Sequence, residues 1–354
     1  MTPAGGVRRY ATELFAAIQA ASPETELIAI GGSAAPAGVS RVAAISPVPT
    51  NLGWCAAGLP LAARRTAFDV FHAPAYTGPL WGVHPLVITI HDVSYARRPE
   101  WSPHPGGVGP LRQAFYRACA VRADRVLTDS TFSKSEIIAA YGIDEGRIDV
   151  VPLGVTPMFR PDASVAREPF VLHVGDLHPR RNLLMLFEAV VDLARHEPRL
   201  AGLQLILAGK DLGVLEDLRA RAASLDALQN LRYLGRPGDA ELVDWYRRAA
   251  VMAYPSRYEG FGLPVLEALA CGTPVVASNA TSIPEVTGDA AVLLPPDGAS
   301  SWAKALREVL LDVDHAHRLS ARGIERARQF TWAHTADLTL RTYESARARP
   351  TAGR

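Results

Sequence analysis

The sequence predicts an α/β protein built from two Rossmann-like domains, each with a parallel sheet flanked by helices. Short runs of valine, leucine and isoleucine alternate with helical stretches along the 354 residues, which is the pattern of parallel strands joined by helical crossovers. After a proline-containing segment, the alternation begins again near residue 170. A chain of this length is also long enough for two domains.

The expected strands are short apolar runs, because parallel strands covered on both faces read as nearly continuous hydrophobic segments. Those of the first half span residues 27–31, 70–72, 86–91, 125–128 and 148–151. Those of the second half span residues 170–175, 203–209, 231–234, 251–254, 275–277 and 291–294.

The two halves are joined by a segment that is poor in regular structure. Pro157 and Pro161 lie close together and predict a linker, because proline interrupts both helices and sheets. We therefore expect a first domain over residues 1–160, a second domain over 161–330 and a final helical segment over 331–354.

The composition argues against several classes of protein. A net charge of +1 with 48% hydrophobic residues describes a globular chain and gives no reason to expect a nucleic acid as partner. No apolar run approaches the ~18 residues that cross a bilayer, and no signal-peptide pattern is present, so we expect a cytoplasmic protein. Cys55, Cys119 and Cys271 lie far apart in apolar contexts, which predicts reduced packing residues.

The most informative stretch runs from the strand at residues 251–254 to the strand at residues 275–277. Gly260 and Gly262 follow the first strand and allow the backbone to approach a ligand closely. Pro264 suits a first helical position and Gly272 a helix end, so that a helix of about two turns directs its free N–H groups toward the glycines. Such a helix end attracts phosphate.

Two carboxylates, Glu259 and Glu267, flank this turn. One of them can accept hydrogen bonds from ribose hydroxyls, and the other can face whatever is attached to the phosphates. The spacing of eight residues alone also arises by chance, and the alternative is a pair of solvated acids. The glycines and the flanking strands favour the nucleotide-binding interpretation.

With Gly260, Phe261, Gly262 and Leu263 between the two acids, the segment closely resembles the E-x7-E signature of the retaining glycosyltransferases of family 4. The resemblance covers nearly the whole chain. Further segments that resemble landmarks of that family, in its order, are residues 5–10, 89–92, 126–130, 151–155, 174–182, 207–209, 234–235 and 282–286. Within the family, the chain is most similar to bacterial mannosyltransferases that use GDP-mannose in polysaccharide or glycolipid assembly.

This resemblance implies the GT-B architecture, in which two Rossmann-like domains face each other across an interdomain cleft. The final segment, residues 331–354, is then expected to cross back to the first domain. The implied reaction moves a hexose, mannose being favoured, from a nucleoside diphosphate sugar to a saccharide or lipid-linked acceptor, with retention of anomeric configuration. The leaving phosphate itself is expected to accept the proton of the acceptor.

The resemblance places the donor in the second domain. Glu259 is implied to hold sugar hydroxyls, and Glu267 the ribose, while the turn residues Gly260, Phe261, Gly262 and Leu263 line the donor site. Arg180 and Arg181 stand at a helix entrance and are expected to bind the diphosphate, because a guanidinium matches phosphate oxygens with a fork of donors. Asp239 is expected either to accept from a guanine edge or to cap the helix at residues 240–250.

One position departs from the family pattern. The family often carries an arginine directly after the glycine at position 175, where this chain has Asp176. At ~4 Å and an effective dielectric near 20, a carboxylate there repels the diphosphate by about 4 kcal/mol. We therefore expect Asp176 to turn aside and to be held by Arg180, with Arg181 as the first choice for the diphosphate.

In the first domain, the resemblance places His91 beside the transferred sugar and the scissile bond. The alternative for a histidine at a strand end is a packed side chain with one hydrogen bond. Gly6 opens a helix that is expected to approach the diphosphate or the acceptor, and Ser130 and Lys134 are expected to add contacts on the acceptor side.

A second departure lies at the start of the chain. Relatives place a β-strand before the glycine pair, whereas here only four residues precede it. The first sheet is thus expected to lack a strand, and we favour a start codon further upstream. The alternatives are a truncated chain or a sheet that tolerates an unfilled position.

No metal or cofactor is expected, because arginines and helix N-termini can offset the charge of the leaving group. Asp312 and Asp314 match a D-x-D metal motif only superficially and are expected at a helix end. Residues 111–122 are expected either to contact the inner face of the membrane peripherally or to form a solvated helix. The alternative functions are a sugar-nucleotide epimerase on the same fold and a non-catalytic protein that binds nucleotide sugars.

Overall fold

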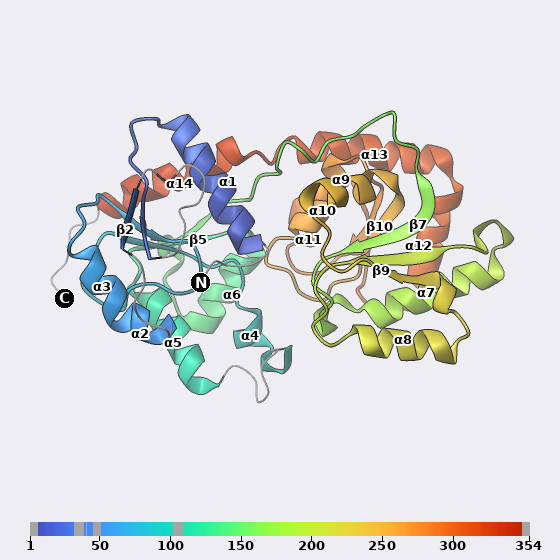
Figure 1. The fold of residues 1–354 in the computed structure, drawn as a ribbon, viewed down its shortest axis with the longest axis horizontal. Helices are drawn as coiled ribbons and strands as arrows, with labels where there is room; N and C mark the ends of the chain where they lie inside the picture. Colours follow the sequence, from blue (N-terminus) through green and yellow to red (C-terminus); the bar gives the residue numbers. More distant parts are fainter. Residues whose placement is uncertain (1–5, 32–38, 40, 45–50, 102–108, 349–354) are drawn as a thin grey trace. The chain divides into compact units, whose positions relative to one another are not determined.

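The structure, a computed structural model, describes residues 6–31, 39, 41–44, 51–101 and 109–348. The chain divides into two compact units, which are described separately below (Figure 1). Unit 1 comprises residues 1–154 and 330–354, and unit 2 comprises residues 155–329. Residues 157–163, where the linker was expected, thus fall within unit 2.

Unit 2 is built on a six-stranded parallel sheet with the order β12-β11-β10-β7-β8-β9. The long strand β7 lies inside the sheet, where it pairs with β10 on one side and with β8 on the other. The strands are β7 (Glu168–Val174), β8 (Gln204–Ala208), β9 (Leu231–Tyr233), β10 (Ala249–Tyr254), β11 (Val275–Ser278) and β12 (Val292–Leu294). Each overlaps a run predicted from the sequence.

Helices cover both faces of this sheet, so that alternate strand residues are buried on opposite sides. Val171 packs in a core with Phe187 and Trp302, which lie on two helices. The neighbouring Phe170 packs against Trp245, with 5.7 Å between the centroids of the two rings. The helices of unit 2 are α7 (Leu183–His196), α8 (Leu215–Ser224), α9 (Asp239–Arg248), α10 (Leu263–Ala270), α11 (Ile283–Thr287), α12 (Ala299–Leu311) and α13 (Val313–Ala327). Short 3-10 turns occur at Pro179–Arg181, Pro198–Leu200 and Leu228–Asn230.

Unit 1 contains a four-stranded parallel sheet with the order β3-β4-β5-β6, and a separate parallel pair, β1-β2. The strands are β1 (Ile28–Ile30), β2 (Arg41–Ala44), β3 (Phe71–Ala73), β4 (Leu86–Thr89), β5 (Arg125–Thr128) and β6 (Ile148–Val150). The expectation of a single first sheet was therefore wrong for the described residues, because β1 is joined to β2 rather than to β3. The sequence did not predict β2, whose four residues carry only one β-branched side chain. Whether a further strand joins the sheet stays a prediction.

The last described helix, α14 (Trp332–Arg347), belongs to unit 1 and covers one face of β4 and β5 (Figure 1). The hydroxyl of Thr335 donates to the Pro152 carbonyl at 2.8 Å. The other helices of unit 1 are α1 (Gly6–Ala21), α2 (Asn51–Gly53), α3 (Leu59–Ala63), α4 (Ser94–Arg97), α5 (Pro110–Arg122) and α6 (Thr131–Tyr141). A π-helical turn spans Trp54–Gly58, and 3-10 turns span Pro99–Trp101 and Glu145–Arg147.

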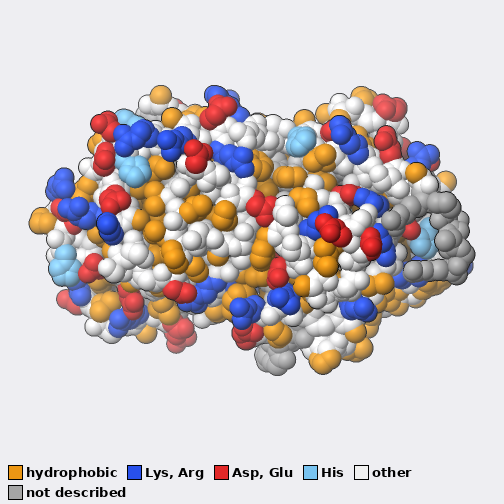
Figure 2. All heavy atoms as spheres, turned by 180° about the vertical axis from the view of Figure 1, so that it is seen from behind, with side chains coloured by type: hydrophobic (Ala, Val, Ile, Leu, Met, Phe, Trp, Pro, Cys, Tyr) orange, Lys and Arg blue, Asp and Glu red, His pale blue; other side chains and the backbone are white. Residues whose placement is uncertain are grey.

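The surface and the cysteines agree with the composition. Cys55, Cys119 and Cys271 are buried and free, which confirms their prediction as reduced packing residues. Basic and acidic side chains are intermixed over the face drawn in Figure 2, as expected for a net charge of +1. None of the helices in the described part of the chain is long and apolar enough to cross a bilayer.

Candidate functional site

The strand, turn and helix predicted around the two glutamates are present in unit 2. Strand β10 ends at Tyr254, and α10 begins at Leu263 with Pro264 in its first turn. Gly262 has a φ of +106°, and a Cβ there would lie 2.6 Å from the side chain of Ile283. Only glycine adopts this backbone without strain, so the turn directs the N-terminus of α10 toward the loop that carries Glu259.

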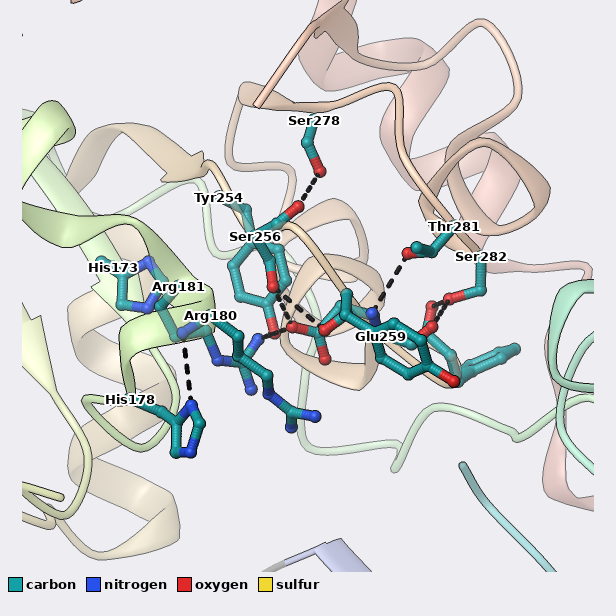
Figure 3. Close-up of polar contacts among 12 residues, drawn as sticks. His173, His178, Arg180, Arg181, Tyr254, Ser256, Glu259, Ser278, Thr281 and Ser282 are labelled. Atoms are coloured by element: carbon teal, nitrogen blue, oxygen red, sulfur yellow. Dashed lines mark hydrogen bonds and ion pairs between the residues drawn. The ribbon is translucent and has the colours of Figure 1, made fainter. Parts of the chain in front are cut away.

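Glu259 is held in a fixed position on this loop (Figure 3). Its side chain accepts hydrogen bonds from Arg181 and from the hydroxyl of Ser256. Its backbone N–H donates to the Thr281 hydroxyl at 3.1 Å, and its carbonyl accepts from the Ser282 hydroxyl at 3.0 Å. With 5% of its surface exposed, Glu259 is a buried carboxylate whose charge is matched by a buried guanidinium.

Arg181 contacts Glu259 from the neighbouring strand, because β7 and β10 are adjacent and the turn after β7 lies beside the end of β10 (Figure 3). Its guanidinium donates to the Tyr254 hydroxyl as well, and its centre lies 4.9 Å from the centroid of the Tyr254 ring. Gly175, with a φ of +137°, leaves the space that this group needs, because a Cβ there would lie 3.3 Å from it. The buried Nε of Arg181 has no hydrogen-bond partner among the described atoms.

His173, which the sequence interpretation missed, extends this cluster. Its ring stacks on Tyr254 with 5.3 Å between the ring centroids, and Nδ1 lies 3.0 Å from the Ala253 carbonyl. Burial and the neighbouring Arg181 lower the pKa of His173 to about 3, so the ring is neutral and Nδ1–H donates to the carbonyl. A histidine inside an otherwise apolar strand is the signal that would have revealed it.

The prediction that Arg180 holds Asp176 was wrong. Its carboxylate lies 3.2 Å from the guanidinium of Arg236 and accepts from the backbone N–H of Lys210 at 3.0 Å. The correction follows from the sheet order: β7, β8 and β9 are adjacent, so the residues that follow them meet at one edge. Arg180 lies in the next turn, where its N–H donates to His178 and its carbonyl accepts from the N–H of Arg257.

Glu267 lies inside α10 and is 3% exposed. The hydroxyl of Tyr246, on α9, donates to its carboxylate at 2.9 Å. Burial and this carboxylate raise the pKa of Tyr246 far above its usual value, so the tyrosine remains a donor. Asp239 is the first residue of α9, and Gly238 is the N-cap, so the expectation that Asp239 caps a helix beginning at residue 240 was wrong by one position.

In unit 1, His91 follows β4 and forms an ion pair with Asp129, which follows β5. Nδ1 of His91 lies 2.8 Å from the carboxylate, and the two side chains are 13% and 4% exposed. Burial alone would lower the pKa of His91, but Asp129 and, more weakly, Asp92 and the Pro74 carbonyl raise it above its usual value. Asp129 lies in residues 126–130, one of the segments that resemble the family, but no function was predicted for it.

The other predicted residues of unit 1 have simpler surroundings. Gly6 is exposed at the start of α1, where a Cβ would meet no atom within 4 Å, and the preceding glycine lies outside the described residues. Ser130 accepts from the Ser133 N–H at 3.0 Å and caps α6. Lys134 lies 3.4 Å from Glu145. Contacts of these residues with a substrate stay predictions.

Unit 1 also contains a hollow at the carboxyl end of β4. Its wall includes the rings of Tyr76 and Tyr116, whose centroids are 6.0 Å apart, together with Tyr141. Asp92 and Gln113 supply polar groups to the same wall. The hollow has a volume of about 60 Å³, well below the ~300–1,000 Å³ of a complete small-molecule site, so it can hold only part of a ligand.

Asp312, one of the two aspartates that resembled a metal motif, has a structural role. Asp312 is the N-cap of α13 and accepts from the N–H of His315 at 2.8 Å, so the prediction of a helix terminus is confirmed. Within the described residues, no group of three or more acidic, histidine or cysteine side chains is arranged to hold a metal ion.

Comparison with known proteins identifies the class to which these features belong. The family model described as "Glycosyltransferase Family 4" matches residues 4–159, and the one described as "Glycosyl transferases group 1" matches residues 157–326. The chain therefore belongs to the glycosyltransferases with these two domains, and it has their GT-B fold. The predictions of an enzyme and of a glycosyltransferase are thereby confirmed.

Among curated proteins, the chain is 32% identical over 287 residues to the O-antigen chain mannosyltransferase B of Escherichia coli, covering 78% of this chain and 74% of the relative. It is 32% identical over 281 residues to the D-inositol 3-phosphate glycosyltransferase of Nocardia farcinica, covering 75% of this chain but only 62% of that relative.

Solved structures share the fold at lower sequence identity. The Anabaena protein HepE in complex with UDP and glucose has a TM-score of 0.74 and 21% identity, covering 98% of this chain and 97% of that one. WaaG, described as a glycosyltransferase involved in lipopolysaccharide biosynthesis, has a TM-score of 0.73 and 16% identity over 99% of this chain and 97% of its own.

Proposed function

We propose that this glycosyltransferase moves a hexose, with mannose favoured, from a nucleoside diphosphate sugar to a saccharide or lipid-linked acceptor, with retention of anomeric configuration. The observation that carries the proposal is the buried cluster of Arg181, Glu259 and Tyr254 beside the glycine turn that opens α10. It combines a fixed cation, a fixed carboxylate and a helix N-terminus within one unit.

The cluster is suited to a sugar diphosphate. Arg181 is positioned by Glu259 and Tyr254 before any ligand arrives, so it loses little freedom on binding a phosphate oxygen. Glu259 offsets part of the positive charge of Arg181. Arg180 and the N–H groups at the start of α10 are therefore proposed to balance the rest of the negative charge of the diphosphate. Preorganised charges of this kind stabilise a departing diphosphate.

Retention without a covalent intermediate is the mechanism that the surroundings of Glu259 support. Its carboxylate is already engaged by Arg181 and Ser256, which lowers its reactivity as a nucleophile. The proposed course is departure of the diphosphate and attack by the acceptor hydroxyl from the same face, with the leaving phosphate accepting its proton. A stable glycosyl adduct on Glu259, found by mass spectrometry, would contradict this course.

Two observations favour a particular donor. The name of the Escherichia coli relative, a mannosyltransferase, supports mannose as the sugar. Asp239, exposed at the start of α9, offers a carboxylate that can accept from the edge of a guanine, which supports GDP-mannose. The membership of the family favours a transferase over the epimerase and binding-protein alternatives.

The hollow in unit 1 is proposed to bind part of the acceptor. Tyrosine rings present an apolar face to a sugar ring. Asp92 already accepts from Ser94, and Gln113 donates to the Tyr95 carbonyl, so their side-chain oxygens are the groups proposed to accept from the sugar hydroxyls. Tyr116→Ala is expected to raise the KM for the acceptor and to leave donor binding unchanged. A loss of donor binding in this variant would contradict the assignment.

Transfer is proposed to need no metal ion, because Arg180, Arg181 and the start of α10 supply positive charge to the leaving group. Product formation should then be equal with EDTA and with Mg²⁺. Loss of activity in EDTA that Mg²⁺ restores would show that a cation takes part.

The first experiment is a thermal-shift panel with GDP-, UDP-, ADP- and dTDP-linked sugars. A ligand at ~100 times its Kd adds about 2.7 kcal/mol to the free energy of unfolding, so one nucleotide class should raise the Tm clearly. Glu267→Ala should weaken that shift, whereas Glu216→Ala, on the exposed face of α8, serves as the matched control. Absence of any shift from folded wild-type protein would contradict the proposal.

A further inference from the structure

The ends of two neighbouring strands in unit 1 bring an imidazole and a carboxylate together. Strands β4 and β5 are paired in parallel, with Thr89 opposite Leu127. His91 follows β4 by two residues, and Asp129 follows β5 directly, so both leave the sheet at the same edge. The contact of 2.8 Å between Nδ1 and the carboxylate is therefore set by the pairing of the strands rather than by a flexible loop.

The ring of His91 is fixed on more than one side. Its backbone carbonyl accepts from the Ser133 hydroxyl at 3.1 Å, and the ring of Tyr10 meets it edge-on with 4.6 Å between centroids. The Pro74 carbonyl also faces the ring and favours its charged form, but the buried Nε2 atom has no hydrogen bond of normal geometry among the described residues. A buried polar atom without a partner is costly in a protein interior, so a fixed ring with such an atom indicates a place for a ligand atom.

We propose that Asp129 is the positioning residue of His91: its carboxylate holds the proton on Nδ1 and fixes the ring so that Nε2 is presented to the substrate. This inference rests on the proposed function and on the family resemblance, which implies that His91 lies beside the transferred sugar. Because a carboxylate only accepts hydrogen bonds, Nδ1 must be the donor in this contact. The partner of Nε2 is an oxygen of the sugar or of the diphosphate.

The groups around His91 decide which protonation state it has. Asp129 and Asp92 both favour the charged ring. His72, on β3, is neutral because burial and the charge of His91 lower its pKa to about 3, and it bonds to Thr89 and to the hydroxyl of Tyr343. Tyr10, on α1, is uncharged and bonds to Thr89 at 2.8 Å. A protonated His91 donates from Nε2, which suits an anionic leaving group.

The same two strands provide an internal control at their opposite ends. His84 precedes β4 and Asp124 precedes β5, with Nδ1 of His84 3.1 Å from the Asp124 carboxylate. The two side chains are 37% and 25% exposed. Asp124→Asn therefore makes the same chemical change to a histidine–aspartate pair outside the candidate site.

The test is a pH titration of ¹⁵N-histidine-labelled full-length protein by NMR, with His91→Gln to assign the signals. In the wild type, His91 is expected to keep its proton on Nδ1 and to titrate above a free histidine. Asp129→Asn should lower its pKa by roughly 1 pH unit or more and favour the other tautomer, because an asparagine amide can donate to Nδ1. Asp124→Asn should leave the His91 signals unchanged. An unchanged His91 titration in Asp129→Asn would overturn the proposal.

Kinetics then test the role in transfer. Asp129→Asn should lower kcat about 10- to 100-fold, change the KM for the donor much less, and move the alkaline limb of the pH profile to lower pH. Unchanged kcat in an active enzyme would overturn the positioning role. Failure of the wild type to bind or transfer any sugar would instead refute the proposed function, while the NMR titration still decides whether Asp129 controls His91.

A second variant covers the case in which Asp129→Asn fails to fold. Asp129→Glu keeps the charge but has one more methylene group, so it displaces the ring. It should leave the pKa of His91 raised while kcat falls, and a pKa returned to that of a free histidine would contradict the proposal.

Discussion

Each unit of this glycosyltransferase buries one acid–base pair at the carboxyl ends of its parallel strands, but the two pairs differ in chemistry. Unit 2 holds Arg181 against Glu259, and unit 1 holds His91 against Asp129. A guanidinium keeps its charge at every physiological pH, whereas an imidazole titrates near neutrality. The comparison suggests that unit 2 supplies a constant charge for binding, and that the pH dependence of sugar transfer arises in unit 1.

The largest effect is expected when one partner of the Arg181–Glu259 ion pair of unit 2 is removed. Arg181→Met leaves Glu259 as an unpaired buried carboxylate and is expected to lower the free energy of unfolding by about 3–5 kcal/mol. The double variant Arg181→Met/Glu259→Gln should recover much of that loss, because no charge remains buried. Urea denaturation of the wild type, the two single variants and the double variant measures the coupling, and additive losses would contradict a buried ion pair.

A second effect appears on acidification. Burial holds the pKa of both His72 and His173 at about 3, well below the unfolded value of about 6.5. The unfolded chain therefore binds protons that the folded chain does not, so stability is lost as the pH falls from about 6.5 toward 3. Each histidine contributes at most about 1.4 kcal/mol per pH unit.

The acid effect is measured by urea denaturation at pH 7 and pH 5. His173→Gln should reduce the difference in unfolding free energy between the two pH values. Replacement of His196, which is exposed on α7, is the matched control. An equal reduction in both variants would contradict the assignment to the buried ring.

A smaller effect is expected from the second acid of unit 2. Tyr246→Phe removes the hydroxyl that donates to the buried carboxylate of Glu267. The loss should be about 1–3 kcal/mol, because a hydrogen bond to a buried charged group is removed. In Tyr233→Phe, the lost hydrogen bond joins a hydroxyl to the neutral Gly209 carbonyl, so that variant should lose less. Thermal unfolding ranks the two, and the reverse order would contradict this interpretation.

The smallest effect is expected in the stability of the protein above neutral pH. The pKa of His91 is raised in the folded protein, so its pairing with Asp129 stabilises the fold below the unfolded pKa of about 6.5. That stability is lost as the pH rises through the folded pKa, with a slope of at most about 1.4 kcal/mol per pH unit. Denaturation between pH 6 and 9 should show the decline in the wild type and a flatter curve in His91→Gln.

The elements that were predicted well are those with local signals. The strand, glycine turn and helix around Glu259 are encoded within about two dozen residues, in which glycine and proline mark each boundary. The short strand β2 escaped prediction because its sequence carries little β preference of its own, and its pairing with β1 creates the element.

Contacts across the sheet were the part that sequence reasoning missed. The partner of Asp176 is Arg236 rather than Arg180 because the strand order, and not distance along the chain, decides which loops meet. The pairing of Asp129 with His91 depends in the same way on the adjacency of β4 and β5. The sequence indicates which strands and loops exist, whereas the sheet order determines which of their side chains touch.

The placement of α14 has a consequence for the order in which the protein is made. Unit 1 includes α14, the last helix of the described residues, whose side chains cover Val87 and Leu127 on one face of its sheet. During translation, every residue of unit 2 leaves the ribosome before α14 does, although N-terminal domains generally fold first. One apolar face of the sheet in unit 1 therefore stays uncovered until α14 has been synthesised. Unit 2, in contrast, can complete its fold during synthesis.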